Sequence, residues 1–173
     1  SFLIMFRDYE QADVLLEKIA AFEEQGNTFL NSDGKEYYER SRAYVDAMLG
    51  RNPVQAAARY AYAVPPGSKR FWQRELGEIW EMAGNPDEAI AAYTRFVTGP
   101  DFWLGNSDQG WAGKVHFRLG ELHEEEGHLD LAIIHYGKVM DRWKDGDAVV
   151  QPKVKEAERR IDALLDRKAQ ESN

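Results

Sequence analysis

The 173-residue sequence contains no cysteine, which excludes disulfide bonds, thiol catalysis and cysteine-ligated zinc. Its six prolines and fourteen glycines are too few for a fibrous or disordered chain. Basic residues are also in deficit, because 22 Lys and Arg stand against 30 Asp and Glu. The resulting net charge of −8 argues against nucleic-acid binding, which needs a basic face. None of these absences identifies the cellular compartment.

Long apolar runs are missing as well. The apolar start, Phe2–Phe6, is too short for a membrane span or for the hydrophobic region of a signal peptide, so no membrane insertion is expected. The chain does not begin with Met, and we interpret it as a piece of a longer polypeptide or as a processed form. On this interpretation the apolar start is the end of an upstream helix.

An internal repeat is the most informative feature that is present. When Phe71–Val97 is set against Lys114–Met140 without gaps, nine of the 27 positions are identical. Self-similarity of this kind indicates a repeat architecture. The identical pairs are Leu76/Leu119, Gly77/Gly120, Glu78/Glu121, Glu81/Glu124, Gly84/Gly127, Asp87/Asp130, Ala89/Ala132, Ile90/Ile133 and Tyr93/Tyr136.

The shared residues predict two antiparallel helices in each unit. Gly120 lies inside the first helix, where glycine costs about 1 kcal/mol, a cost that is tolerable if a second helix approaches closely. Ala132 is the natural small partner, and Tyr136, one turn later on the same face, can fill the remaining space. The same reasoning applies to the unit 43 residues earlier.

Turn residues divide the helices. Gly84 and Gly127 fit the left-handed residue that ends a helix. Asn85 and Pro86 then begin the next helix as cap and first position, and Glu88 can reach back to complete the cap. Gly50 followed by Asn52-Pro53-Val54-Gln55 repeats this device upstream and indicates a third, more diverged unit.

These residues together resemble the tetratricopeptide repeat (TPR) family. The resemblance rests on Leu-Gly, a second Gly seven residues later, and Ala-x-x-x-Tyr twelve residues after the first Gly. It implies an all-α chain, an α-solenoid of antiparallel helix pairs with about eight helices and a C-terminal capping helix. The sequence departs from the family pattern at Gln73, His116 and His123, and Arg42 replaces the usual Leu in the diverged unit. The expected organisation is a single domain over 1–173, with a diverged repeat at about 36–65, clear repeats at about 70–100 and 113–144, and a capping helix at about 151–168.

Hydrophobic periodicity and turn signals predict the individual helices. The first carries Ala12, Leu15, Leu16, Ile19 and Phe22 on one face. In the last, apolar residues at helical spacing oppose a charged face, as a terminal repeat cap requires, and residues 167–173 are expected to fray. The expected helices are 9–25, 34–49, 53–63, 68–83, 86–98, 112–126, 129–143 and 151–168.

Known catalytic and metal-binding patterns fail in detail. His123 and His128 are five residues apart with Gly127 between them, whereas HExxH needs four on one helix face. His116 and His123 are therefore read as packing residues in aromatic positions, with a metal site involving His135 as the less favoured alternative. The segment before Gly113-Lys114 lacks the first glycine and the final hydroxyl residue of a phosphate loop. We expect no enzyme activity, no cofactor and no metal.

The family resemblance implies a function in binding proteins or peptides through the first helix of each pair. Glutamates at two of these positions disfavour a carboxylate-terminal ligand and favour a basic or amphipathic segment, although they can equally be solvated helix surface. The residues expected to face a partner are Tyr37, Arg40, Tyr44, Phe71, Arg74, Glu78, Glu81, Lys114, Phe117, Glu121 and Glu124.

The insertion between the clear repeats is a second candidate surface. Trp103 in residues 102–111 is the expected contact there, because repeat insertions often lie on binding faces. The alternative is that Trp103 and Trp111 fold back and fill the gap between units.

Two functions therefore remain. One is a protein-interaction module, similar to the TPR tails of bacterial multidomain signalling proteins such as serine/threonine kinases and transcriptional activators. The other is a structural or oligomerisation element of an envelope or secretion assembly. It would self-associate through Phe2, Leu3, Ile4 and Phe6 or through the tryptophan loop.

Overall fold

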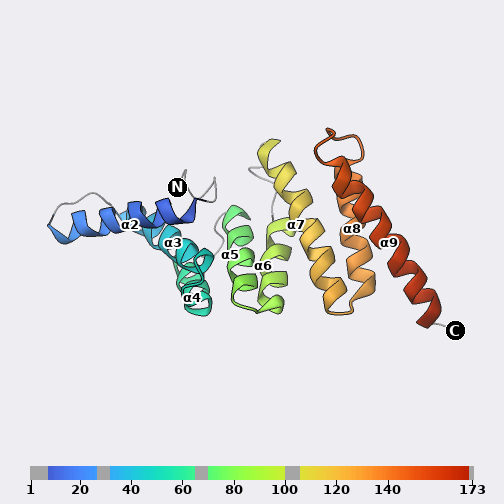
Figure 1. The fold of residues 1–173 in the computed structure, drawn as a ribbon, viewed down its shortest axis with the longest axis horizontal. Coiled ribbons are helices and arrows are strands. Elements are labelled where there is room, and N and C mark those ends of the chain that lie inside the picture. The colour runs from blue at the N-terminus through green and yellow to red at the C-terminus, as the bar shows by residue number, and fades with distance from the viewer. Residues whose placement is uncertain (1–7, 27–31, 65–69, 100–105, 172–173) are drawn as a thin grey trace. The chain divides into compact units, whose positions relative to one another are not determined.

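The computed structural model describes residues 8–26, 32–64, 70–99 and 106–171. These residues are all-α, with eight helices and no strand among them (Figure 1). The fold class is thus as the sequence predicts. No helix of the described residues is both long enough and apolar enough to cross a bilayer. The helices are α2 (Tyr9–Glu24), α3 (Ser32–Met48), α4 (Pro53–Ala63), α5 (Arg70–Met82), α6 (Pro86–Thr98), α7 (Asn106–Glu125), α8 (Leu129–Trp143) and α9 (Gln151–Glu171).

Seven of the eight helices begin within two residues of their predicted starts, and the larger differences lie at the start of α7, near the insertion, and at the end of α9. Helix α7 begins at Asn106, six residues before the predicted start, so Trp111 is helical and does not belong to a loop. Helix α9 continues to Glu171, where Arg167 pairs with Glu171 at 3.0 Å one turn later. The prediction that residues 167–171 fray is therefore wrong. Residues 1–7 and Trp103 lie outside the described part of the chain.

Three helices end in the same glycine turn. Gly50, Gly84 and Gly127 all have φ between 68° and 76°, and each following residue donates its N–H back to the carbonyl five positions earlier. This is the Schellman arrangement, which satisfies the last carbonyls of a helix. The left-handed conformation predicted for Gly84 and Gly127 is confirmed.

Helices α4 and α6 start as their Asn-Pro sequences predict. The Asn52 side-chain oxygen accepts from the Gln55 N–H at 3.3 Å, and that of Asn85 accepts from Glu88 N–H at 3.5 Å. Asn52 itself has φ +45°, a left-handed conformation that asparagine tolerates better than most residues.

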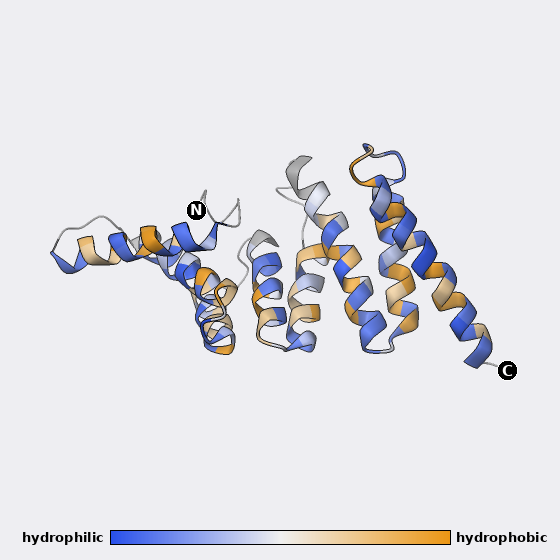
Figure 2. Cartoon of the chain, viewed as in Figure 1, coloured by the Kyte–Doolittle hydropathy of each residue, from blue (hydrophilic) through white to orange (hydrophobic). Residues whose placement is uncertain are grey.

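The chain divides into two compact units, residues 1–92 and 93–173, with the division inside α6. This division does not test the prediction of a single domain, because a repeat array has contacts mainly between neighbouring repeats. In the first unit α3 packs against α4 and α5, and in the second α8 packs against α7 and α9. Figure 2 shows the expected mixture of hydrophobic and hydrophilic residues along each helix, with α9 mostly hydrophilic.

The predicted apolar face of α2 is only partly used. Ala12 and Leu16 are buried and pack with Val45 of α3, whereas Leu15 and Phe22 are largely exposed. Ion pairs from Asp13 to Arg42 and Arg51 add polar contacts to this apolar packing.

Candidate functional site

An arginine between two aromatic rings forms an exposed feature of the first unit. The Arg40 Cζ lies 4.5 Å from the centre of the Tyr37 ring and 4.3 Å from that of the Trp72 ring. The two rings contact each other edge to face, with centroids 5.9 Å apart. Tyr37 is 50% exposed and Trp72 is partly exposed. We call Tyr37, Arg40 and Trp72 the aromatic patch.

Three helices hold the aromatic patch in place. Tyr37 and Arg40 lie three residues apart on α3 and therefore share a face, and Trp72 comes from the first turn of α5. Arg40 Nη1 donates to the carbonyl oxygen of Ala63, the last residue of α4, at 2.9 Å. The guanidinium is thus anchored at a helix C-terminus, where a cation is favoured, and it stacks on both rings.

A buried tyrosine–glutamate cluster lies beside the patch. The Tyr44 hydroxyl donates to Glu78, and the Tyr60 hydroxyl donates to Glu75 at 2.5 Å. Arg74 then donates to both carboxylates, at 2.5 Å to Glu78 and 3.2 Å to Glu75. Each carboxylate is thus shared by a hydroxyl and a cation, as burial of a charged group requires.

Burial also sets the protonation states in this cluster. Desolvation, followed by the charge of Glu78, raises the pKa of Tyr44, and desolvation with the charge of Glu75 does the same for Tyr60. Desolvation raises the pKa of Glu75, against the opposing effect of the Tyr60 hydrogen bond. Both tyrosines therefore keep their protons and act as donors at neutral pH.

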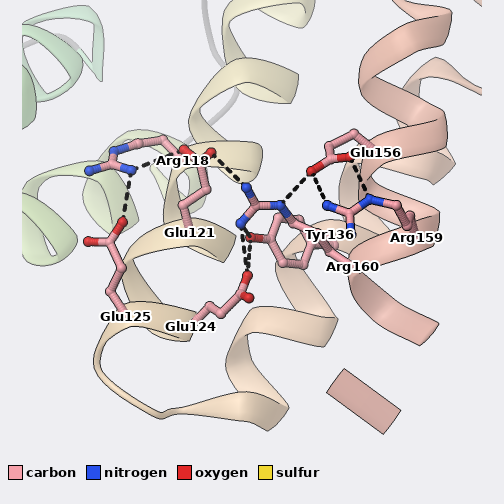
Figure 3. A network of polar contacts seen from close by, with 8 residues as sticks. All are labelled: Arg118, Glu121, Glu124, Glu125, Tyr136, Glu156, Arg159 and Arg160. Atoms are coloured by element: carbon pink, nitrogen blue, oxygen red, sulfur yellow. Dashed lines mark hydrogen bonds and ion pairs between the residues drawn. The ribbon is translucent and has the colours of Figure 1, made fainter. Parts of the chain in front are cut away.

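In the second unit, Arg160 of α9 connects α7, α8 and α9 in one network of hydrogen bonds (Figure 3). Its guanidinium donates to Glu124 at 3.0 Å, to the Tyr136 hydroxyl at 3.1 Å and to Glu156 at 2.9 Å. The Tyr136 hydroxyl in turn donates to Glu124 at 2.8 Å. We call these four residues the Arg160 network.

The Arg160 network continues along α7 and α9. Arg118 donates to Glu121 at 3.0 Å, and Arg160 lies 3.6 Å from the other oxygen of Glu121. Hydrogen bonds from Arg159 and Arg160 lower the pKa of Glu156 to about 2. Glu156 is therefore ionised and paired at neutral pH.

The glutamates that were expected to face a partner are not free charges in the structure. Glu78, Glu121 and Glu124 are half-buried and each is paired with an arginine, so they are neither freely solvated nor available as unpaired charge. The reason is that the arginines of α5, α7 and α9 lie on the same faces as the glutamates. Glu81 is also half-buried.

The remaining predicted contacts separate by burial. Phe117 belongs to the core of the second unit, 5.4 Å from the Tyr136 ring, with Lys153 Nζ 3.8 Å above its own ring. Its predicted role as a contact residue is therefore not supported by its position. Lys114 is exposed and lies 4.6 Å from the centre of the Trp111 ring.

The structure thus brings together Tyr37, Arg40, Tyr44, Arg74 and Glu78 in the first unit. Of these, only Tyr37 is substantially exposed. The side chain of Phe71 and the whole of Trp103 lie outside the described part of the chain.

Two important residues were missed by sequence reasoning. Trp72 follows Phe71 directly, and the sequence interpretation stopped at Phe71. Arg160 lies on α9, whose Lys, Arg, Glu and Asp residues the sequence interpretation assigned to the polar outer face of a capping helix, and no sequence signal distinguished it from them.

The histidines do not form a metal site in the described residues, where no group of three or more His, Asp or Glu is arranged to hold a metal ion. His116 and His123 are buried, which agrees with their interpretation as packing residues in aromatic positions. Comparison of the chain with protein-family models, curated proteins and solved structures gives no match.

Proposed function

We propose that the chain is a non-catalytic, tetratricopeptide-type module that binds a peptide or a domain of another protein. The family assignment rests on the sequence pattern described above. Helices that end in glycine turns, and the packing of Tyr136 against the helical Gly120, are consistent with it. Membership of a larger bacterial regulatory protein stays a prediction from the sequence.

The aromatic patch is the observation that carries the proposal. Tyr, Trp and Arg are the residues most enriched at binding hot spots, and the two aromatic side chains bury much area with few rotatable bonds. Here the three are already ordered against one another, so a partner that covers Tyr37 and Trp72 loses little side-chain entropy.

The pairing of the glutamates changes the expected chemistry of the partner. Unpaired acidic side chains would favour a basic ligand, but Glu78 is held by Tyr44 and Arg74. Arg40 already covers one face of the Tyr37 ring and one face of the Trp72 ring. The amphipathic segment among the predicted partners therefore fits better than a purely basic one, with its apolar side chains against Tyr37 and Trp72.

A peptide library displayed on phage tests this proposal. Selection on the whole chain, after depletion on the Tyr37→Ala/Trp72→Ala variant, should enrich peptides with apolar residues at helical spacing. Tyr62 of α4 is 94% exposed and lies outside the patch, so Tyr62→Ala is the matched control. Enriched peptides should bind Tyr62→Ala as they bind the unchanged chain. Failure to enrich any peptide that distinguishes these two variants would contradict the proposal.

A further inference from the structure

All four histidines of the chain lie on or next to the α7–α8 pair, and three of them contact one another. His116 and His135 approach with their Nδ1 atoms 3.0 Å apart. The His123 ring stacks on that of His135, with centroids 5.4 Å apart and an angle of 14° between the planes. His128 lies at the start of α8, 5.7 Å from His123. We call His116, His123 and His135 the histidine cluster.

This geometry suits neutral rings and opposes charged ones. A hydrogen bond between two Nδ1 atoms needs one ring to carry the proton and the other to accept it, so His116 and His135 cannot both be protonated and keep the bond. Nδ1 of His123 is buried and has no hydrogen-bond partner among the described residues. A proton there would place a charge without an acceptor inside the protein.

No carboxylate offsets a charge on His123 or His135 among the described residues. The charge of His128 acts on His123, and the charge of His123 acts on His135. On α9, Lys153 and Arg160 lie over Phe117 and Tyr136. The other charged groups on nearby helices are paired elsewhere or exposed. Those paired in or beside the Arg160 network are Arg118, Glu121 and Glu124. Those that are exposed are Arg95 of α6, Glu125, Lys138 and Arg142.

The histidine cluster is also adjacent in sequence to the Arg160 network. His123 precedes Glu124 on α7, and His135 precedes Tyr136 on α8. Glu124 and Tyr136 are the two residues through which α7 and α8 hold Arg160 of α9. A displacement of either histidine therefore moves a residue that anchors α9.

We infer that the histidine cluster is a proton-operated switch: its protonation loosens the α7–α8 pair and releases α9. At neutral pH His123 and His135 are neutral and the cluster is closed. Acidification charges these two rings, separates His116 from His135, and so displaces Glu124 and Tyr136 from Arg160.

The direction of the pH effect follows from the burial of the rings. Desolvation lowers the pKa of His123, and desolvation with the charge of His123 lowers the pKa of His135 to about 4, from an ordinary value of 6.5. The unfolded or opened state therefore binds more protons between these values. Stability of the second unit is constant above pH 6.5 and falls as the pH drops from 6.5 towards 4.

Amide hydrogen exchange of the whole chain, corrected for intrinsic rates, tests the switch. Between about pH 7 and about pH 5, opening of α7, α8 and α9 should increase about tenfold, since one unit of unmatched pKa is a factor of ten. Helices α3 and α4 contain no histidine and serve as the internal control, with a change below about twofold. An equal response in α3 and α4 would overturn the inference.

Variants separate the cluster from other titrating groups. Asparagine can replace the Nδ1 hydrogen bond of histidine without titrating, so His135→Asn and, independently, His116→Asn should remove most of the response in α7–α9. His128→Gln removes an exposed histidine outside the cluster, together with its charge beside His123, and should keep most of the response. An unchanged response in the asparagine variants would contradict the switch. An NMR titration of the unchanged folded chain gives a second test that does not depend on the variants folding. Ordinary pKa values for all three histidines of the cluster would also contradict the switch.

Discussion

The ring of Trp143 on α8 occupies the space that a Cβ atom on Gly113 of α7 would need. A Cβ built there would lie within 2.9 Å of three ring atoms, closer than real Cβ contacts allow. Tyr136 stands in the same relation to Gly120. The two glycines are seven residues apart on α7, and the two rings are seven residues apart on α8. We call each glycine with the ring packed on it a glycine socket. The two sockets lie two turns apart and hold α7 and α8 together.

The first prediction concerns the Gly113 socket. Gly113→Ala should destabilise the chain by about 1–3 kcal/mol, because the ring of Trp143 must move, and this outweighs the gain in helix propensity. Gly110→Ala on the same helix is the matched control, since nothing lies within 4 Å of its Cβ position. Gly110→Ala should be neutral or stabilising by up to about 1 kcal/mol. Chemical denaturation of both variants checks the difference, and equal effects would refute the socket.

The second prediction concerns the attachment of α2. Asp13 accepts two hydrogen bonds from Arg51, both at 2.7 Å, and lies 3.0 Å from Arg42. Asp13→Asn should lower the local stability of α2 by about 1 kcal/mol, seen as faster hydrogen exchange in α2. Helices α3 and α4 should stay protected. Glu17→Gln is the control, because Glu17 is exposed and pairs only with Arg42 among the described residues. The same loosening in both variants would contradict this account.

The carboxylate of Asp13 also gives α2 a pH dependence of known sign. The hydrogen bond from Arg51 lowers the pKa of Asp13 below its ordinary 3.8. Its stabilising contribution is therefore fully present above that value and is lost as the pH falls through the lower, folded pKa. Added salt should weaken it at neutral pH.

The third prediction separates two neighbouring arginines on α9. Arg160→Ala removes the donor shared by Glu124 and Tyr136 and should cost about 1–3 kcal/mol. Arg159 is exposed and pairs only with Glu156 among the described residues, so Arg159→Ala should leave the free energy of unfolding almost unchanged. Hydrogen exchange should locate the Arg160→Ala effect at α9. If the two substitutions cost the same, the Arg160 network does not hold the helix.

The fourth prediction concerns the buried tyrosine–glutamate cluster. Tyr60→Phe leaves a buried oxygen of Glu75 without its donor and should cost about 1–3 kcal/mol. Tyr62→Phe, two residues later on α4 and almost fully exposed, should leave the free energy of unfolding unchanged within about 0.5 kcal/mol. Thermal and chemical unfolding of the two variants decide between them.

The sequence predicts the helices well because their ends are marked locally. Asn52 and Asn85 cap helices, and Gly50, Gly84 and Gly127 end them, each within two residues of the helix boundary that it marks. The start of α7 was missed because residues 106–111 contain no apolar periodicity. The exposed Leu15 shows the opposite limit, since periodicity gives a face but not what covers it.

The site was less predictable, because its contacts join residues far apart in the sequence. The hydrogen bond from Arg160 to Glu124 spans 36 residues, and that from Tyr44 to Glu78 spans 34. The resemblance to the repeat family placed Tyr37, Arg40 and the glutamates on inner helices. It could not show that Arg74, Arg118 and Arg160 pair with those glutamates, or that Trp72 completes the aromatic patch.

The binding function depends most directly on Tyr37. We therefore expect calorimetric titration with a peptide selected on the unchanged chain to show at least about tenfold weaker binding to Tyr37→Ala. Tyr62→Ala should bind within about twofold of the unchanged chain, and both variants should unfold at the temperature of the unchanged chain within about 3 °C. Equal affinities for all three proteins would contradict the assignment of the aromatic patch as the binding surface.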